Sequence, residues 1–198
     1  MLSAMGADPI FLTRAAEGLD RRGFTLEEVE KMIAAGVIDP DERFELIEGE
    51  IVPMNPQEMP HLLMKGRLGG ALLNARPHGV DVVQDATVVL GERSFFDADI
   101  LVFRADRARR YVEPRDVLLA VEVAETSRSR DLFTKAPRYG ATGVAELWVV
   151  ELNEELTYVF RGPGTAAWAE PERVPFDEAL TPMLLPDARI RLSELVQT

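Results

Sequence analysis

The chain contains no cysteine among its 198 residues. Disulfide bonds, thiolate metal sites and cysteine nucleophiles are therefore excluded. Only two histidines are present, His61 and His78, and they are too few for a metal site built on imidazole groups. A metal ion in this protein would have to be held mainly by oxygen ligands.

The sequence also lacks the motifs of several large enzyme classes. It has no G-x-G-x-x-G, Walker or G-x-S-x-G pattern, which argues against dinucleotide binding, P-loop chemistry and an α/β-hydrolase site. No apolar stretch approaches the length of a membrane span, and the first residues lack the basic and apolar regions of a signal peptide. We therefore expect a cytoplasmic protein that does not enter a membrane.

Acidic residues outnumber basic ones by 34 to 22. The formal net charge is −12, which is unfavourable for a nucleic-acid partner because phosphate binding depends on Lys and Arg. The segment from Arg104 to Arg138 differs, since its nine basic and six acidic residues give it a charge of +3 and leave −15 for the rest. This local excess would suit a phosphate-bearing partner. The alternative is that these arginines are simply solvent-exposed side chains on a loop and a helix face, and the charge alone is equally consistent with it.

The length and the ordinary composition, 46% hydrophobic and 28% charged, suit a single domain. We expect a loosely ordered arm over residues 1–22 and one mixed α/β domain over residues 23–198. Hydrophobic periodicity, capping residues and turn residues place the elements. Helices are predicted over 26–36, 60–75 and 128–141, and strands over 43–47, 50–54, 80–84, 86–90, 96–103, 116–124 and 144–150. A hairpin over 151–161 and apolar stretches over 179–185 and 190–195 follow.

Two of these strands should be parallel. The chain between the strand over 116–124 and the strand over 144–150 is about long enough for a helical crossover, which joins parallel strands. Pro137 lies inside the predicted crossover helix, and because proline cannot donate a hydrogen bond it must kink that helix or lie near its start.

Asp99 and Glu122 stand out because each lies within an apolar, strand-like run. Asp99 is followed by four apolar residues, and Glu122 is the only charge from Val117 to Ala124. Burying an unpaired carboxylate costs roughly several kcal/mol, so it persists only with a partner, hydrogen bonds or a metal. A salt bridge to a nearby arginine is the structural alternative, whereas the clustering of perturbed carboxylates at functional sites favours a site. Alternate residues of a strand share a face, so Asp97 lies on the same face as Asp99, but it could simply be solvated at the start of its strand.

These residue types suit a metal-dependent phosphodiesterase. Mg²⁺ commonly takes one or two carboxylates and keeps waters and substrate phosphates as its other ligands, and Asp99 and Glu122 on neighbouring strands would supply that set. Lys135, on the predicted crossover helix, could position or deprotonate the attacking water, or neutralise charge on the phosphate. Taken alone, Lys135 is weak evidence for a site, because exposed lysines are common on helices and a solvated helix face explains it better.

The spacing of these residues resembles the PD-(D/E)XK nuclease superfamily, with an aspartate in one strand and a glutamate about twenty residues later in the next. More closely, the chain resembles a bacterial family described as putative restriction endonucleases, once classed as a domain of unknown function. The resemblance covers residues from about 24 to the end, although each motif is short. The matching stretches are 43–50, His61, 98–102, 120–123, 131–139, 143–150, 184–186 and 190–195.

The resemblance implies a restriction-endonuclease-like fold, in which helices flank a central mixed sheet, with extra strands at both ends of the chain. It implies Mg²⁺-dependent (or Mn²⁺-dependent) cleavage of DNA, with Asp99 and Glu122 as metal ligands and catalytic residues and Lys135 as the catalytic lysine. Glu45 becomes a further acidic candidate. Arg128 and Arg130 are candidates for holding phosphates.

This chain departs from the superfamily pattern at three places. Ala98 occupies the position of the motif's proline, a mild change because that proline performs no chemistry. Ala124 occupies the usual lysine position, so that Lys135 must serve from the helix instead. Glu125 and Thr126 replace a small Ser-Pro pair, and the added carboxylate could either join the metal site or repel DNA.

A DNA endonuclease is therefore the leading hypothesis for the function. A non-catalytic protein that keeps the nuclease fold but acts through protein or nucleic-acid binding is the main alternative and would agree with the charge of −12. A hydrolase of small phosphorylated or nucleotide substrates is a third. A homodimer is plausible because cutting both DNA strands needs two sites, but no stretch of the sequence identifies an interface.

Overall fold

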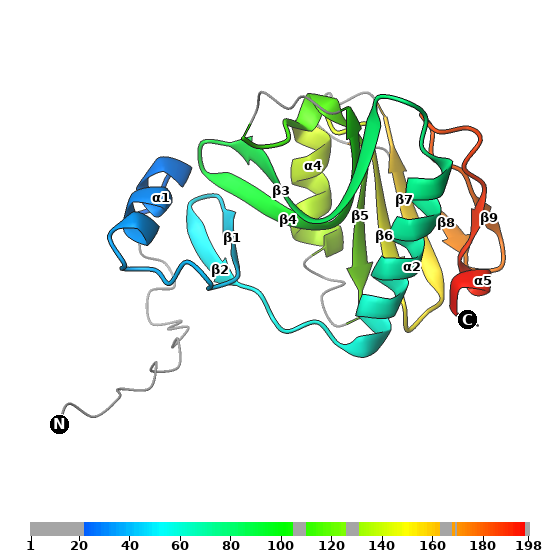
Figure 1. The fold of residues 1–198 in the computed structure, drawn as a ribbon, viewed down its shortest axis with the longest axis horizontal. Coiled ribbons are helices and arrows are strands. Elements are labelled where there is room, and N and C mark those ends of the chain that lie inside the picture. The colour runs from blue at the N-terminus through cyan, green and yellow to red at the C-terminus, as the bar shows by residue number, and fades with distance from the viewer. Residues whose placement is uncertain (1–21, 105–109, 126–130, 163–167, 169, 197–198) are drawn as a thin grey trace.

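A computed structural model describes residues 22–104, 110–125, 131–162, 168 and 170–196 (Figure 1). The predicted loosely ordered arm over residues 1–22 lies outside the described residues except for Arg22, so it stays a prediction. The helical elements are α1 (Leu26–Ala34), α2 (Met59–Ala75), the 3₁₀ turn η2 (Pro114–Asp116), the π-helical turn η3 (Asp131–Lys135), α4 (Ala136–Ala141) and α5 (Leu192–Val196). The strands are β1 (Phe44–Ile47), β2 (Glu50–Pro53), β3 (Val80–Gly91), β4 (Ser94–Arg104), β5 (Val117–Ala124), β6 (Glu146–Glu151), β7 (Leu156–Arg161), β8 (Glu172–Pro175), β9 (Ala179–Leu180) and β10 (Ile190–Arg191).

Within the described residues, one eight-stranded mixed sheet organises the chain, and β9 and β10 form a separate two-stranded sheet. The main sheet runs in the order β2-β1-β4-β5-β6-β7-β8, and β3 also pairs with β4. β5 and β6 are parallel, as their helical crossover predicts, and the other neighbouring strands are antiparallel. The predicted mixed α/β sheet with flanking helices is confirmed.

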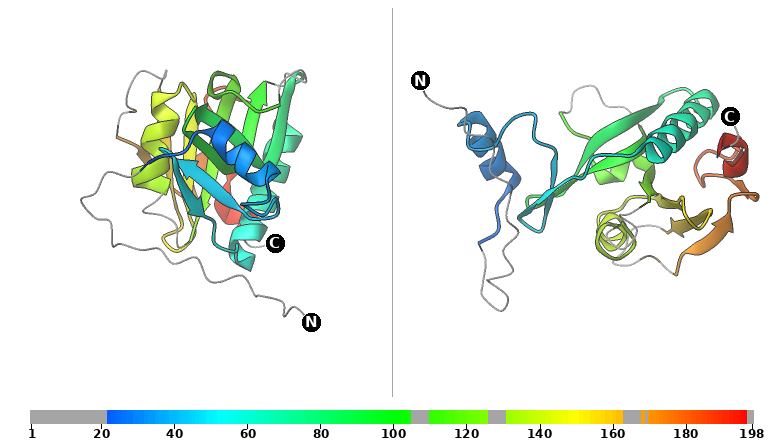
Figure 2. Two further views of the ribbon diagram at one scale, coloured as in Figure 1. Left: turned by 90° about the vertical axis from the view of Figure 1, so that its left-hand side faces the viewer. Right: turned by 90° about the horizontal axis from the view of Figure 1, so that it is seen from below.

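Helices α2 and α4 lie on opposite faces of the sheet, as the views in Figures 1 and 2 agree. On the α2 face, Met64, Leu68 and Leu72 pack in one hydrophobic cluster with Val121 and Trp148. On the α4 face, the cluster members Ala136, Tyr139, Ala120, Ala124 and Leu147 pack together. From Leu119 to Ala124 the apolar residues of β5 alternate between the two clusters, and every residue of this strand is buried.

A small N-terminal unit extends the sheet at one end. Thr25 and Glu28 form the predicted capping box that begins α1, and α1 packs against the hairpin of β1 and β2. The hairpin turns at Glu48 and Gly49, both with positive φ, as a two-residue turn requires. This unit attaches to the rest of the molecule where β1 runs antiparallel to β4, with Leu46 opposite Phe95.

The ribbon of β3 and β4 is interrupted at Asp85 and Asp99. Residues pair in register on both sides, with Gln84 opposite Ile100 and Ala86 opposite Ala98, but no pairing occurs between the two aspartates. Asp85 has φ +50°, which breaks the extended backbone of β3. The strict alternation expected for β4 is therefore interrupted, since Phe96, Ala98 and Leu101 share one hydrophobic cluster. The segments predicted as separate strands over 80–84 and 86–90 are one strand with a break between them.

The predicted crossover helix is only partly regular. Residues 128–130 lie outside the described part of the chain, the turn η3 is π-helical, and α4 begins at Ala136. Pro137 lies in the first turn of α4, where its missing N–H costs no hydrogen bond. In the part of the chain that is described, no helix has the length and hydropathy of a membrane span.

Candidate active site

A cavity of about 380 Å³ opens beside β4, β5, the start of α2 and η3. Both candidate metal ligands from the sequence line it, and both are nearly inaccessible: Asp99 is 6% exposed and Glu122 is 3% exposed. Lys135 lines the same cavity. Its acidic lining consists of Glu58, Asp97, Asp99, Glu122, Glu125 and Asp131. The structure therefore brings the three predicted catalytic residues together.

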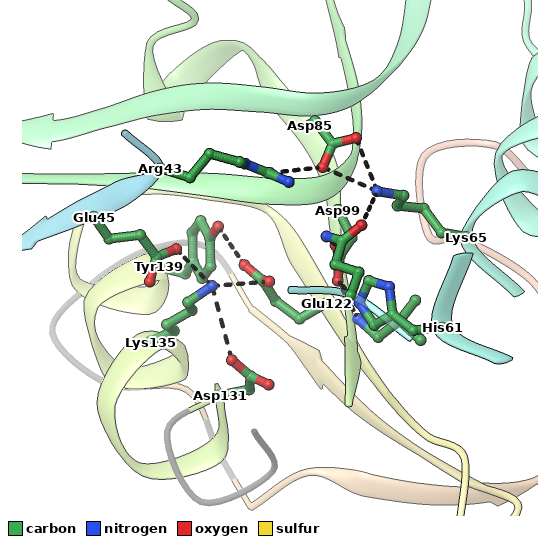
Figure 3. A network of polar contacts seen from close by, with 12 residues as sticks. Arg43, Glu45, His61, Lys65, Asp85, Asp99, Glu122, Asp131, Lys135 and Tyr139 are labelled. Carbon is green, nitrogen blue, oxygen red and sulfur yellow. Dashed lines mark hydrogen bonds and ion pairs between the residues drawn. The ribbon is translucent and has the colours of Figure 1, made fainter. Parts of the chain in front are cut away.

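Lys135 is the centre of a buried charge cluster (Figure 3). Its Nζ atom lies 2.7 Å from Glu45 Oε1 and 3.0 Å from Glu122 Oε2. Asp131, one turn earlier, contributes a carboxylate oxygen at 3.8 Å. Asp131 and Lys135 are four residues apart in the π-helical turn η3, and such turns are frequent at functional sites.

The cluster keeps Lys135 protonated. Burial by itself lowers the pKa of this ammonium, but the carboxylates of Glu122, Glu45 and Asp131 outweigh that effect and raise the pKa above its usual range. A lysine with such a pKa is a poor general base near neutral pH. Of the roles that the sequence left open, neutralising charge and positioning a water therefore fit this geometry better than deprotonation.

Glu122 has a second partner on α4. The Tyr139 hydroxyl donates a hydrogen bond of 2.8 Å to Glu122 Oε1, and its ring packs edge-on against Phe96. Burial raises the pKa of Glu122 well above its ordinary value; Lys135 opposes the rise, while Asp131, Asp99 and Glu45 add to it. Burial, followed by the charge of Glu122, also raises the pKa of Tyr139. The hydroxyl of Tyr139 is therefore a donor to Glu122 throughout the physiological pH range.

Asp99 is held from three directions. Its Oδ2 atom accepts a 2.7 Å hydrogen bond from the backbone N–H of Val123 and lies 3.0 Å from His61 Nε2. Its Oδ1 atom accepts a 3.1 Å hydrogen bond from the side-chain amide of Gln57. Because the aspartate can only accept, its contact with His61 requires a proton on Nε2. These bonds fix the carboxylate at the break in β4 and leave an acceptor site on Oδ1, which has only one of these partners.

A second buried lysine adjoins Asp99. Lys65 of α2 is 3% exposed, and its Nζ donates to Gln57 Oε1 at 2.6 Å and to both carboxylate oxygens of Asp85 at 2.8 and 2.9 Å. Arg43 donates to Asp85 from the other side at 3.1 Å. Burial alone raises the pKa of Asp85, but Lys65 and Arg43 more than offset this and lower it.

The remaining candidates from the sequence have different positions. Glu45 is fully buried against Lys135 and does not line the cavity, so its geometry is that of a partner for the lysine. Arg128 and Arg130 lie outside the described residues. Asp97 lines the cavity and accepts a 2.6 Å hydrogen bond from the Thr87 hydroxyl.

The arginine excess expected around the site is partly neutralised. Arg110 pairs with Glu30 at 2.9 Å and Arg115 pairs with Glu113 at 2.7 Å. Arg138, on α4, lies 2.6 Å from a carboxylate oxygen of Glu48. These three side chains already have anionic partners, so the local charge of the sequence overstates the positive field available to phosphates.

Sequence reasoning did not identify Gln57, Lys65 and Asp85 as part of the site. A signal for Lys65 was present, because it lies between Met64 and Leu68 on the predicted apolar face of α2 and four residues after His61. A lysine in that position of an amphipathic helix must be buried or must reach around the helix. Asp85 has no comparable signal, since it separates two strand-like runs as a turn residue would.

The donor set of the cavity fits a hard divalent cation. In the described part of the chain no three acidic or histidine side chains are already arranged around a metal position. Two carboxylates are nevertheless enough for Mg²⁺ or Mn²⁺, which complete their coordination with water and substrate oxygens. Burial raises the pKa of Glu122 although Lys135 opposes the rise, and a cation beside this carboxylate would favour its charged form.

Known proteins resemble this chain in sequence and in fold. The sequence model of the Uma2 family, described as putative restriction endonuclease, matches residues 26–193. The crystal structure of a putative nuclease belonging to DUF820 from Anabaena variabilis superposes with a TM-score of 0.69 at 16% sequence identity, covering 88% of this chain and 98% of that chain. No curated protein matches the sequence. The family match confirms the resemblance drawn from the motifs, and the structural match supports the fold.

Proposed function

Because the chain belongs to the Uma2 family of putative restriction endonucleases, we propose that it is a divalent-metal-dependent nuclease that hydrolyses phosphodiester bonds in DNA. The observation that carries this proposal is the convergence of Asp99, Glu122 and Lys135 on one cavity. Two buried carboxylates and an ammonium on neighbouring elements are costly to assemble for stability alone, since burying charges rarely gains free energy. A catalytic role therefore explains these buried charges better than a stabilising role does.

Asp99 and Glu122 would hold Mg²⁺ or Mn²⁺ through their carboxylate oxygens. When bound, the cation would polarise a phosphoryl oxygen and offset the charge that develops during hydrolysis. Val123 N–H and His61 keep Asp99 oriented toward the cavity, and Tyr139 orients Glu122. Lys135, held protonated, would place a fixed positive charge beside the reacting phosphate and orient a water molecule.

DNA is the proposed substrate because of the family to which the chain belongs, and it must be bound despite a net charge of −12. The divalent cation itself would contribute positive charge at the point of cleavage. If two chains cut the two strands of a duplex, the active species would be a homodimer. Binding of DNA should weaken steeply as salt increases, because phosphate contacts release counterions.

The direct test is cleavage of a supercoiled plasmid by purified protein in Mg²⁺, in Mn²⁺ and in EDTA. We expect nicked or linear DNA with either metal and none with EDTA. Asp99→Asn, purified in parallel, should abolish cleavage and thereby exclude a contaminating nuclease. Asp81→Asn, at the far end of the β3 and β4 pairing opposite Phe103, is the matched control and should cut like the wild type.

Isothermal titration with Mn²⁺ separates metal binding from turnover. The wild type should bind Mn²⁺, whereas Asp99→Asn and Glu122→Gln should each bind it much more weakly. The proposal is wrong if the wild type neither binds Mg²⁺ or Mn²⁺ nor cleaves DNA at any protein concentration. A stable protein partner in the absence of any DNA affinity would instead favour a non-catalytic role for the fold.

A further inference from the structure

The buried ammonium of Lys65 has its three hydrogen-bond directions occupied. Two contacts go to the two oxygens of Asp85, and the third, at 2.6 Å, goes to Gln57 Oε1. A lysine ammonium carries three donors and no acceptor, so it demands acceptors in all three places. Lys65 does not line the cavity, and it therefore reaches the candidate metal site through Gln57.

That demand fixes the orientation of the Gln57 side chain. Its oxygen must face Lys65, because an ammonium cannot accept a hydrogen bond, and its NH₂ group then points to Asp99 Oδ1 at 3.1 Å. Rotating the amide by half a turn would set the NH₂ group against the ammonium and the carbonyl against the carboxylate. Both contacts would become repulsive, so only one orientation is stable.

The same residues lie at the break in the β3 and β4 ribbon. Asp85 occupies the position of β3 that the register would place opposite Asp99. Two carboxylates facing each other across strands repel. The Lys65 ammonium and the Gln57 amide link them instead, so that the path from Asp85 to Asp99 alternates acceptor and donor at each contact. Figure 3 shows Lys65 joined to Asp85 beside Asp99.

We propose that Lys65 and Gln57 act as a positioning pair that holds the carboxylate of Asp99 in the orientation for binding a divalent cation, with Lys65 acting only through Gln57. This inference rests on the proposed function, since it assumes that Asp99 is a metal ligand. Partners that hold metal ligands in place change metal affinity by about 10- to 100-fold when they are removed. The contrasting explanation is that Lys65 and Asp85 form a buried ion pair that stabilises the fold and does not influence the site.

A double-mutant cycle on Mn²⁺ affinity distinguishes these explanations. Gln57→Leu keeps the volume of the side chain but removes both hydrogen bonds, and Lys65→Met keeps the aliphatic stem but removes the charge. Each should weaken Mn²⁺ binding about 10-fold in isothermal titration. The double variant should lose no more than either single variant, because Lys65 acts through Gln57.

Arg67→Met is the matched control on the same helix. Arg67 donates to the backbone carbonyl of Leu195 at 2.7 Å and does not line the cavity, so its replacement should leave Mn²⁺ affinity unchanged. Circular dichroism and urea unfolding identify any variant that has lost its fold. Gln57 precedes α2 in a partly exposed segment, so Gln57→Leu is expected to fold even if Lys65→Met does not.

The positioning proposal is overturned if folded Gln57→Leu binds Mn²⁺ as tightly as the wild type, or if the losses of the two single variants add. In either case the proposed function survives, provided that the wild type binds Mn²⁺ and Asp99→Asn does not. If the wild type itself binds no Mn²⁺, both proposals fail. The wild-type and variant titrations together therefore show whether the positioning proposal alone or both proposals fail.

Discussion

The Nζ atom of Lys135 lies 3.0 Å from Oε2 of Glu122, and both side chains are almost completely buried. β5 supplies the carboxylate, and the π-helical turn η3 of the crossover to β6 supplies the ammonium. A lysine in the superfamily's usual position would instead replace Ala124, two residues after Glu122 on the same strand. Ala124 is fully buried in the cluster beneath α4, so a lysine there would overpack that cluster. The turn η3 provides the ammonium that β5 lacks at this position.

Replacing Lys135 by Met should destabilise the protein by about 3–5 kcal/mol, because it leaves the carboxylates of Glu45, Glu122 and Asp131 buried without their cation. The measurement is the free energy of unfolding in urea. Lys31→Met, which removes an exposed lysine paired with Glu27 at 2.6 Å, is the control and should unfold close to the wild type.

The loss in Lys135→Met should also depend on pH. In the wild type, burial already raises the pKa of Glu122 above its unfolded value, and removing the cation raises it further. A carboxyl group with a raised pKa in the folded state costs stability only where it must ionise, so the deficit should shrink as pH falls from 8 to 5. A deficit that stays constant over this range would contradict the assignment of the buried charges.

Replacing Tyr139 by Phe should cost about 1–3 kcal/mol in unfolding free energy, because Glu122 Oε1 loses a buried donor at 2.8 Å. Tyr111→Phe offers a matched comparison, since its hydroxyl also donates at 2.8 Å to a glutamate, Glu30, but at a partly exposed position. Water can replace that donor, and so the loss at Tyr111 should be the smaller one. Equal losses would mean that burial does not strengthen the bond to Glu122.

Replacing Glu45 by Gln distinguishes a partner of Lys135 from a metal ligand. Glu45 lies against the ammonium but outside the cavity lining, so we expect a loss of about 1–3 kcal/mol in stability with Mn²⁺ affinity changed less than about threefold. Asp99→Asn in the same titration should lose most of its affinity. If Glu45→Gln weakens Mn²⁺ binding as strongly as Asp99→Asn, Glu45 belongs among the ligands.

Replacing Gly49 by Ala should destabilise the β1–β2 hairpin, which carries Glu45. Gly49 has φ +88°, and an added Cβ would lie 2.7 Å from Gly23 Cα, a backbone atom that cannot move aside cheaply. Strain and overlap together should cost about 2–4 kcal/mol. Gly36→Ala separates the two terms, because Gly36 has φ +71° and open space around it, and it should cost only about 1 kcal/mol. Thermal unfolding of both variants gives the comparison.

Sequence reasoning located Asp99 and Glu122 because charges in apolar runs are visible without any structure. Lys135 came instead from its place on the predicted crossover helix and from the family resemblance. Asp99 and Glu122 converge because β4 pairs with β5, and Lys135 joins them because it lies on the crossover from β5 to the parallel strand β6, which the crossover length predicts. The motifs correctly pointed to the family. The catalytic roles of the three residues stay predictions until metal binding and cleavage are measured.

Other parts of the site depend on contacts that sequence spacing does not encode. Lys65 is joined to Asp85 and Gln57 only because α2 lies across the break in β3. That break comes from the positive φ of Asp85, a residue that resembles an ordinary turn. Glu45 was predicted as an acidic member, but its fully buried position against Lys135 results from how the hairpin docks on β4. The positive charge of the arginine-rich segment could not be predicted by counting residues either. Ion pairs such as Arg138 with Glu48 neutralise arginines that the count treats as free cations.

Strand β1 and the residue just before it connect both buried lysines of the site. Arg43 donates to Asp85, the partner of Lys65, and Glu45 contacts Lys135. If the hairpin detached from β4, Lys135 would lose the carboxylate of Glu45, and Asp85, the partner of Lys65, would lose Arg43. Local opening of this edge should therefore be as costly as opening the centre of the sheet. Amide hydrogens of β1 should consequently exchange almost as slowly as those of β5, although β1 lies near the end of the sheet. The docked N-terminal hairpin would then supply two of the charged groups, Glu45 and Arg43, that hold the buried charges of the site together.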